Sequence, residues 1–451
     1  MADFSKSHSP RFAVEVHQNP RLPRGAREVH AVVTVTATGS GGLPLPVEEP
    51  RAAVVLMVDC SGSMNRPPDK LRQTRLATEA AIGALRDGVA FAIVAGNHRA
   101  AEVFPGGGRL AVADDVTRAA ARAAARGLTA SGGTAIGTWL RLAARLFDSL
   151  PDRVTVRHGV LLTDGRDEHE TPERLREALD ACAGRFTCDA RGVGTDWDPG
   201  EVTGIASALL GTADIVAEPE GLAADFTAMM TAATGKGVGD VALRLWTPHG
   251  ASVVFLRQVS PGLEDLTSRR VESPPRSGDY PTGSWGDESR EYHLCVRVED
   301  AGVGRELLAA RVGLVVREPG APAAPPAAVP GRGHGLVRAV WTDDLAAATA
   351  VDPRVAHYAG QTEMVRAIRE GLDLRRRGDT AGATARLGRA VRLAHLSGNE
   401  ATAKLLAKVV DVDDAATGTV RLKARVSEAD AMTLETRSTK TVRVKKPSED
   451  E

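Results

Sequence analysis

The stretch VVLMVDCSGSM, residues 54–64, decides the fold. Its first five residues are apolar, which is typical of a strand that is buried on both faces. The strand ends on a carboxylate, Asp59, which is followed by the hydroxyls of Ser61 and Ser63. Ligand sites of parallel sheets lie outside the carboxyl ends of the strands. Oxygen-bearing side chains at this point therefore indicate a binding site.

Strands alternate with helices on the carboxyl-terminal side of that stretch, over residues 52–235. The apolar pattern predicts four core strands, at 52–58, 89–96, 159–163 and 187–194. It predicts helices at 70–86, 114–126, 134–149, 172–183 and 221–233. This alternation favours an α/β fold with a doubly wound, mainly parallel sheet and helices on both faces.

Segments with a period of two flank the α/β region on both sides. Residues 12–38 alternate between apolar and polar side chains, and so does the chain within 236–318. Such alternation predicts antiparallel strands with one buried face. Because residues 1–51 are too short to fold alone, we expect them to complete a β-sandwich with 236–318. The α/β domain would then be inserted in an antiparallel β-sandwich.

The last third of the chain consists of three segments that differ in composition and periodicity. Residues 319–335 are rich in Pro and Ala, which predicts a semi-rigid linker. Residues 336–410 carry helical periodicity and are expected to form a small helical domain that resembles one helical-hairpin repeat. Residues 411–451 are polar and charged without apolar periodicity, so we expect a disordered tail.

The composition of the chain argues against nucleic acid and membranes as partners. The 451 residues include 57 Lys and Arg against 58 Asp and Glu, a net charge of −1, so no overall field attracts nucleic acid or an anionic membrane. No run approaches the roughly 20 apolar residues that cross a bilayer, and the start of the chain lacks the apolar core of a signal peptide. The four cysteines show no metal-ligand spacing and are expected to be reduced, buried thiols. These features predict a cytoplasmic protein.

Two further residues occupy strand or helix ends where they could join the first three. Thr134 opens a predicted helix after a Ser-Gly-Gly turn, and Asp164 directly follows the strand at 159–163. Together with Asp59, Ser61 and Ser63 they supply three hydroxyls and two carboxylates. Hard divalent cations prefer such oxygen ligands. With the three neutral hydroxyls bound directly and the two carboxylates acting largely through water, the charge of the ion would be only partly balanced and one position would stay open. Such an ion would attract a carboxylate from outside.

This pattern resembles the metal-ion-dependent adhesion site of von Willebrand factor A domains. The family pattern Asp-x-Ser-x-Ser, then Thr, then Asp after a later core strand, here the one at 159–163, matches Asp59, Ser61, Ser63, Thr134 and Asp164 with nothing missing. The resemblance covers about residues 52–235. It implies that the site binds Mg²⁺ or Mn²⁺ and that a Glu or Asp of a protein partner completes the coordination. It therefore implies a non-catalytic interaction module.

Two other functions remain open on the sequence. A serine hydrolase could use Ser61 or Ser63 as nucleophile, but the G-x-S-x-G elbow is missing and the nearest candidate bases, His158 and His169, are remote in sequence. Alternatively, the metal site could be vestigial and the helical domain could act as a scaffold. That domain carries six arginines that could bind an acidic partner: Arg375, Arg376, Arg377, Arg386, Arg389 and Arg392.

The tail suggests a second way of binding a partner. LETRSTKTVRVKK, residues 434–446, places Ser438, Thr439 and Thr441 among basic residues. It resembles the tail segments that bacterial Ser/Thr kinases phosphorylate and forkhead-associated domains bind. The resemblance implies Thr439 or Thr441 as the phosphate acceptor, within a signalling system of that type.

Overall fold

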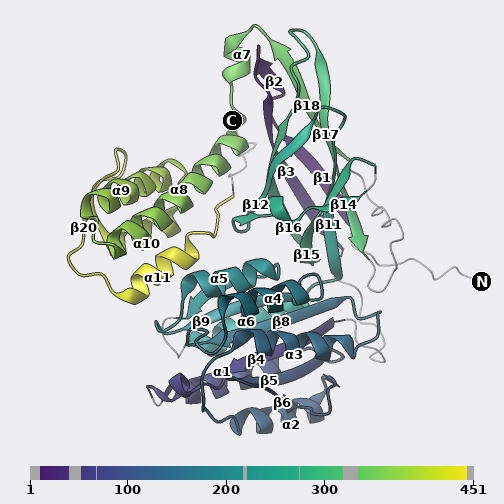
Figure 1. Ribbon diagram of the computed structural model, residues 1–451, viewed down its shortest axis with the longest axis vertical. Coiled ribbons are helices and arrows are strands. Elements are labelled where there is room, and N and C mark those ends of the chain that lie inside the picture. Colours follow the sequence, from purple (N-terminus) through teal and green to yellow (C-terminus); the bar gives the residue numbers. More distant parts are fainter. Residues whose placement is uncertain are drawn as a thin grey trace, which may run out of the picture.

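A computed structural model describes residues 11–39, 52–67, 69–216, 221–273, 275–317 and 334–443. It contains an α/β domain, a β-sandwich and a helical domain. Figure 1 shows the helical domain beside the sandwich, with helix α11 (Glu428–Arg437) extending toward the α/β domain. Among the described residues, no helix is long and apolar enough to cross a membrane.

The α/β domain is built on a seven-stranded sheet with β4 near its centre. The strand order is β10-β9-β8-β4-β5-β6, and β7 also pairs with β5. Strands β10, β9, β8, β4 and β5 are parallel, whereas β6 and β7 run antiparallel to β5. The strands are β4 (Ala52–Asp59), β5 (Ala90–Gly96), β6 (Ala100–Phe104), β7 (Ala111–Val112), β8 (Val156–Thr163), β9 (Thr187–Val193) and β10 (Ala213–Val216).

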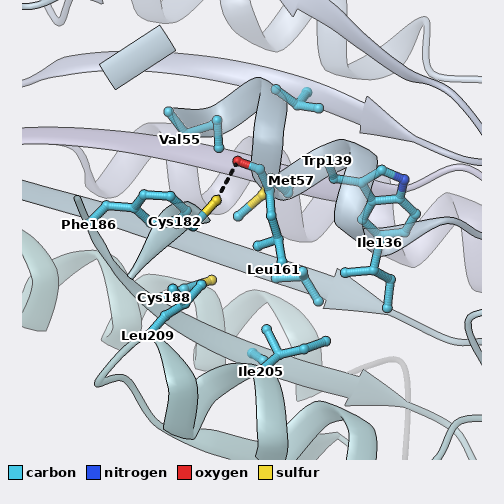
Figure 2. Close-up of a cluster of buried hydrophobic side chains, with 14 of the residues drawn as sticks. Val55, Met57, Ile136, Trp139, Leu161, Cys182, Phe186, Cys188, Ile205 and Leu209 are labelled. Carbon is cyan, nitrogen blue, oxygen red and sulfur yellow. Dashed lines mark hydrogen bonds between the residues drawn. The ribbon is translucent and has the colours of Figure 1, made fainter. Parts of the chain in front are cut away.

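Helices cover both faces of this sheet, which explains the unbroken apolar run of β4. Val54 and Leu56 face a cluster with helices α1, α2 and α6, whereas Val55 and Met57 face a cluster with α3, α4 and α5. Figure 2 shows the second cluster, in which the Cys182 thiol donates to the carbonyl of Leu140. The helices are α1 (Asp69–Ala84), α2 (Asp115–Arg126), α3 (Ile136–Asp148), α4 (Pro172–Cys182), α5 (Pro199–Ala208) and α6 (Leu222–Thr234).

The β-sandwich combines strands from both sides of the α/β domain. One sheet has the order β1-β3-β16-β12-β13 and the other β14-β15-β11-β17-β18-β2. Strand β3 lies between β1 and β16, so the amino-terminal segment contributes an interior strand. The strands are β1 (Arg11–His17), β2 (Arg21–Pro23), β3 (Glu28–Thr38), β11 (Val238–Trp246), β12 (Ser252–Ser260), β13 (Glu264–Asp265), β14 (Val271–Ser273), β15 (Ser277–Trp285), β16 (Glu288–Arg297), β17 (Glu306–Arg317) and β18 (Gly335–Thr342).

The helical domain starts later in the chain than the sequence predicts, because β18 occupies its expected first residues. Residues 336–342 were expected to be helical, but they pair with β17 and β2 at the edge of the sandwich. Val337, Ala339 and Trp341 are buried in its core, which is the period-two pattern of a strand. The remainder of the predicted linker, 319–333, lies outside the described residues.

The helical domain proper begins after β18. Its helices are α7 (Leu345–Thr349), α8 (Pro353–Arg376), α9 (Thr380–Leu396) and α10 (Glu400–Val409). Side chains of α8, α9 and α10 share one apolar cluster that includes Ile368, Leu387 and Leu406. The domain packs on the outer face of β3 and β12, where Val355 and Tyr358 of α8 meet Val32 and Val259 (Figure 1).

The prediction of a disordered tail is wrong for residues 411–443. They form a hairpin, β19 (Val410–Asp414) and β20 (Thr419–Leu422), and a helix, α11 (Glu428–Arg437). The segment has few apolar residues, but Val420 and Leu434 are buried in the core of the helical domain and Met432 in that of the α/β domain. Local periodicity could not reveal this, because the buried surface is provided by distant parts of the chain.

The segment after α11 is held against the β-sandwich. The carbonyl of Thr439 accepts from the Leu263 amide at 2.9 Å, and the Thr441 amide donates to the Pro261 carbonyl at 3.1 Å. The Thr441 hydroxyl donates to the Val259 carbonyl. These contacts remove the exposed, extended tail on which the prediction of phosphorylation at Thr439 or Thr441 rested.

Candidate metal centre

The carboxyl ends of β4 and β8 are adjacent because the two strands are parallel neighbours. Asp59, the last residue of β4, is fully buried. Its Oδ1 accepts from the Ser61 amide at 2.8 Å, and its Oδ2 accepts from the Thr163 hydroxyl at 2.8 Å and the Asp164 amide at 3.3 Å. Asp59 is thus held in one position by the loops that follow both strands.

The two serines connect this carboxylate to the second one. They lie where the loop after β4 turns into a short 3₁₀ helix, Gly62–Asn65. The Oγ atoms of Ser61 and Ser63 are 2.8 Å apart, and Ser63 donates to Oδ1 of Asp164 at 2.6 Å. Asp164 is itself fully buried. Four of the five predicted residues therefore form one continuous hydrogen-bonded group.

Thr134 reaches the group from the loop before α3. That loop is tied to the β4 loop because the Ser131 amide donates to the Cys60 carbonyl and the Gly62 amide to the Gly132 carbonyl, both at 2.8 Å. A Cβ atom at Gly165 would lie 3.4 Å from Thr134 Oγ1 and 3.5 Å from Ser63 Oγ. Both hydroxyls thus border the same glycine, and the structure brings all five predicted residues together.

Lys70 is a functional candidate that sequence reasoning missed. It lies in the first turn of α1, is 3% exposed, and places its Nζ 2.6 Å from Oδ2 of Asp164 and 3.6 Å from Oδ2 of Asp196. A lone lysine near a helix start carries no sequence signal that separates it from an ordinary surface residue. Thr163 was missed as well, although its position directly before Asp164 at a buried strand end could have indicated it.

The charges of the centre favour the binding of a cation. Burial as the main cause, and the neighbouring charge of Asp164 as the second, raise the pKa of Asp59 to about 6. Lys70 balances one carboxylate, whereas the donors to the second carboxylate, among the residues that the structure describes, are hydroxyl and amide groups. A hard divalent ion would supply the missing positive charge, and the donor set consists of oxygen atoms, which suits such an ion.

The two candidate bases, His158 and His169, make hydrogen bonds to residues other than the serines. His158 lies in the first half of β8, at the opposite end from Asp164, and its ring nitrogens contact Thr187 at 2.9 Å and Asp189 at 3.0 Å. His169 donates its backbone amide to the Thr134 carbonyl at 3.0 Å. Within the described ranges, no histidine is hydrogen-bonded to Ser61 or Ser63.

Family models match two parts of the chain. Residues 52–215, which contain the whole metal centre, match the von Willebrand factor type A domain, and residues 392–438 match the von Willebrand factor type A C-terminal domain. A solved structure described as von Willebrand factor type A from Catenulispora acidiphila is 50% identical, covers 98% of this chain and 99% of its own, and superposes with a TM-score of 0.90. The chain belongs to the von Willebrand factor type A family.

More distant solved structures share the fold. The ArnB paralog VWA2 from Sulfolobus acidocaldarius is 13% identical, with a TM-score of 0.54, and the match covers 95% of this von Willebrand factor type A chain and 98% of that one. The human COPII-coat protein Sec24c is 9% identical, with a TM-score of 0.50, over 87% of this chain and 57% of its own. No curated protein matches in sequence. The family C-terminal domain at 392–438 includes α11, so the ordered tail is part of the family architecture.

Proposed function

We propose that this protein is a non-catalytic, metal-dependent docking module. Asp59, Ser61, Ser63, Thr134 and Asp164 would hold Mg²⁺ or Mn²⁺, and a Glu or Asp of a protein partner would complete the coordination. The observation that supports this most is the convergence of all five residues, from three separate loops, on one buried hydrogen-bonded group.

The chemistry of the residues explains why the partner would offer a carboxylate. Three of the five side chains are neutral hydroxyls, and Lys70 already neutralises Asp164. A divalent ion would therefore keep a net positive charge in a place with little water, where electrostatic attraction is strong. When bound, the ion supplies a Lewis-acidic position that an oxygen anion can occupy. In this proposal the chain's own residues orient that position and take no part in a covalent step.

Asp59→Asn tests this proposal, because it keeps the shape of the side chain and removes its charge. We expect the wild-type protein to bind about one Mg²⁺ or Mn²⁺ per chain in calorimetry and Asp59→Asn to bind none. Asp115→Asn, at a fully exposed side chain outside the centre, is the matched control and should bind as the wild type does. Equal binding by wild type and Asp59→Asn would refute the metal site.

The docking part of the proposal needs a separate experiment. Partners captured from the source cells by the immobilised wild-type protein should be released by EDTA and restored by Mg²⁺. They should be absent from Asp59→Asn. A partner that binds both proteins equally, with or without EDTA, would instead support the alternative in which the helical domain acts as the scaffold.

The arginines of the helical domain give that alternative little support. Four of the six form ion pairs within their own part of the chain: Arg376 with Glu435, Arg377 with Asp373, Arg386 with Glu370 and Arg389 with Glu363, at 2.7–3.1 Å. An acidic partner would have to replace these contacts.

The cytoplasmic location stays a prediction. Phosphorylation of Thr441 and capture by a forkhead-associated domain would first require release of the tail from the sandwich.

A further inference from the structure

A second group of metal-ligating side chains lies far from the candidate centre, on the outer face of the β-sandwich. Glu28 and His30 belong to β3, and Cys295 belongs to β16. In the register of the two strands, His30 is directly opposite Cys295 and Glu28 is opposite Arg297. Residues two apart on a strand share a face, so Glu28, His30 and Cys295 project from the same side of the sheet.

The spacing of the three ligand atoms suits one small ion. The carboxylate oxygen, the imidazole nitrogen and the thiol sulfur all lie within 4.8 Å of one another. His30 Nε2 and Cys295 Sγ are 3.8 Å apart. Two ligands of a tetrahedral zinc ion, with Zn–N and Zn–S bonds of about 2.0 and 2.3 Å, are separated by roughly 3.6 Å. The observed separation therefore needs only a small adjustment.

His293 is placed to orient the imidazole of His30. Its Nε2 lies 3.2 Å from Nδ1 of His30. This separation allows a hydrogen bond in which His30 is the donor and His293 the acceptor. A proton on Nδ1 of His30, donated to His293, leaves the Nε2 lone pair directed at Cys295. Metal-binding histidines are commonly fixed in this way by a second residue.

The charges of these side chains and the access of solvent to the group also suit a divalent ion. Cys295 is fully buried, whereas Glu28 is at the surface, which gives the ion a route in. Arg297 donates to one oxygen of Glu28 at 2.7 Å and leaves the other oxygen available. A thiolate and a carboxylate together neutralise a divalent cation. Because a metal ion binds cysteine as the thiolate, binding must release the thiol proton of Cys295 to solvent.

We propose that Glu28, His30 and Cys295 form a second metal site, which takes a zinc-like, thiophilic divalent ion with His293 as a positioning residue. The mixture of sulfur, nitrogen and oxygen ligands distinguishes it from the all-oxygen centre around Asp59. His30 lies two residues along β3 from Val32, which contacts α8 of the helical domain. A bound ion would fasten β3 to β16 beside that contact.

Co²⁺ is the probe of choice for this site, because a cobalt–thiolate bond gives a charge-transfer band in the near ultraviolet and oxygen ligands do not. The full-length wild-type protein should show the band, and Zn²⁺ should remove it. Asp59→Asn should keep the band, although it loses Mg²⁺ binding. Failure of this proposal and failure of the docking proposal are therefore distinguishable.

Substitutions of single residues would identify the side chains that bind Co²⁺. Cys295→Ser and His30→Gln should lose the band, whereas Cys60→Ala, at the cysteine beside the oxygen centre, should keep it. His293→Phe should weaken Co²⁺ binding by about 10- to 100-fold, and Glu28→Gln, at an exposed position, should weaken it at least tenfold without unfolding the protein. Absence of the band in the wild type, its persistence in Cys295→Ser, or unchanged affinity in both Glu28→Gln and His293→Phe would overturn the proposal and leave only a thiol–imidazole hydrogen bond.

Discussion

Lys70 and Asp164 form a buried ion pair inside a centre that is itself expected to bind a cation. Taking both charges out of water costs several kcal/mol, and the pair is stable only because the contact is short and Ser63 also donates to Asp164. Lys70 thus holds the carboxylate in place while no metal is bound. It also lowers the negative charge that a metal ion would experience.

Replacing Lys70 with Met should therefore have opposite effects on the protein without and with metal. Loss of one partner of a buried pair costs about 3–5 kcal/mol, so the free energy of unfolding in EDTA should fall by that order. The affinity for Mg²⁺ should rise at least tenfold, because Asp164 regains its full charge. Denaturant unfolding and calorimetry measure the two quantities.

Lys408→Met is the matched control for that experiment. Lys408 pairs with Asp430 at 2.9 Å, but its side chain is 55% exposed, and exposed pairs contribute about 0–1 kcal/mol. A Lys70→Met protein as stable as Lys408→Met, with unchanged Mg²⁺ affinity, would show that the buried pair has no part in the centre.

Glu201 offers a test of pH dependence near the centre. It accepts from the Asp167 amide at 3.2 Å, and burial raises its pKa to about 7. A carboxyl whose pKa is raised on folding binds its proton more tightly in the folded protein, so its contribution to stability is lost as the pH rises from about 4.5 through 7. Glu201→Gln should flatten the fall of unfolding free energy in that range. Parallel pH profiles for both proteins would contradict the assignment.

At the scale of elements, the β19–β20 hairpin packs on α9 through two glycines. A Cβ atom at Gly388 of α9 would lie 2.3 Å from the carbonyl oxygen of Gly418, which is closer than any real contact. Gly418 has a φ of 77°, a conformation that non-glycine residues rarely adopt. This close approach of two backbones is what lets Val420 reach the core of the helical domain.

Gly388→Ala should therefore destabilise the protein although alanine is the better helix former. The gain in helix propensity is about 1 kcal/mol, and it is outweighed because the hairpin must move away from α9. Gly360→Ala, in α8, is the control, since nothing lies within 4 Å of its Cβ position. Thermal unfolding should show a lower Tm for Gly388→Ala and an equal or higher Tm for Gly360→Ala. A higher Tm for both would refute the packing argument.

At the scale of the whole molecule, the chain enters the sandwich, leaves it to form the α/β domain, and returns. Strand β3 pairs with β1 on one side and β16 on the other, so 236–317 alone lacks an interior strand. The tail then links the parts: Arg437 and Lys440 both pair with Asp214 at the edge of the α/β sheet, while Gln361 of α8 donates to the Val442 carbonyl at 2.7 Å.

Separate fragments should reflect this topology. The fragment 52–235 contains the whole seven-stranded, mainly parallel sheet with both faces covered and should be soluble and fold cooperatively. The fragment 236–317 should aggregate, because removal of β3 and β18 exposes sheet edges and one face of the core. Circular dichroism and denaturant titration would show whether each fragment folds cooperatively. Cooperative folding of isolated 236–317 would show that the amino-terminal strands are dispensable.

The sequence by itself determined what depends on short-range pattern. The apolar run of β4 and the helices that alternate with the strands have local periods, and Asp59, Ser61, Ser63, Thr134 and Asp164 stand at strand or helix ends that those periods reveal. Only the tertiary structure decided the rest. Residues 336–342 become a strand because β17 offers an open edge. The tail is ordered because distant surfaces bury Met432 and Leu434, and Lys70 reaches Asp164 only once α1 lies against β4, since such contacts join residues far apart in the chain and leave no periodic trace in it.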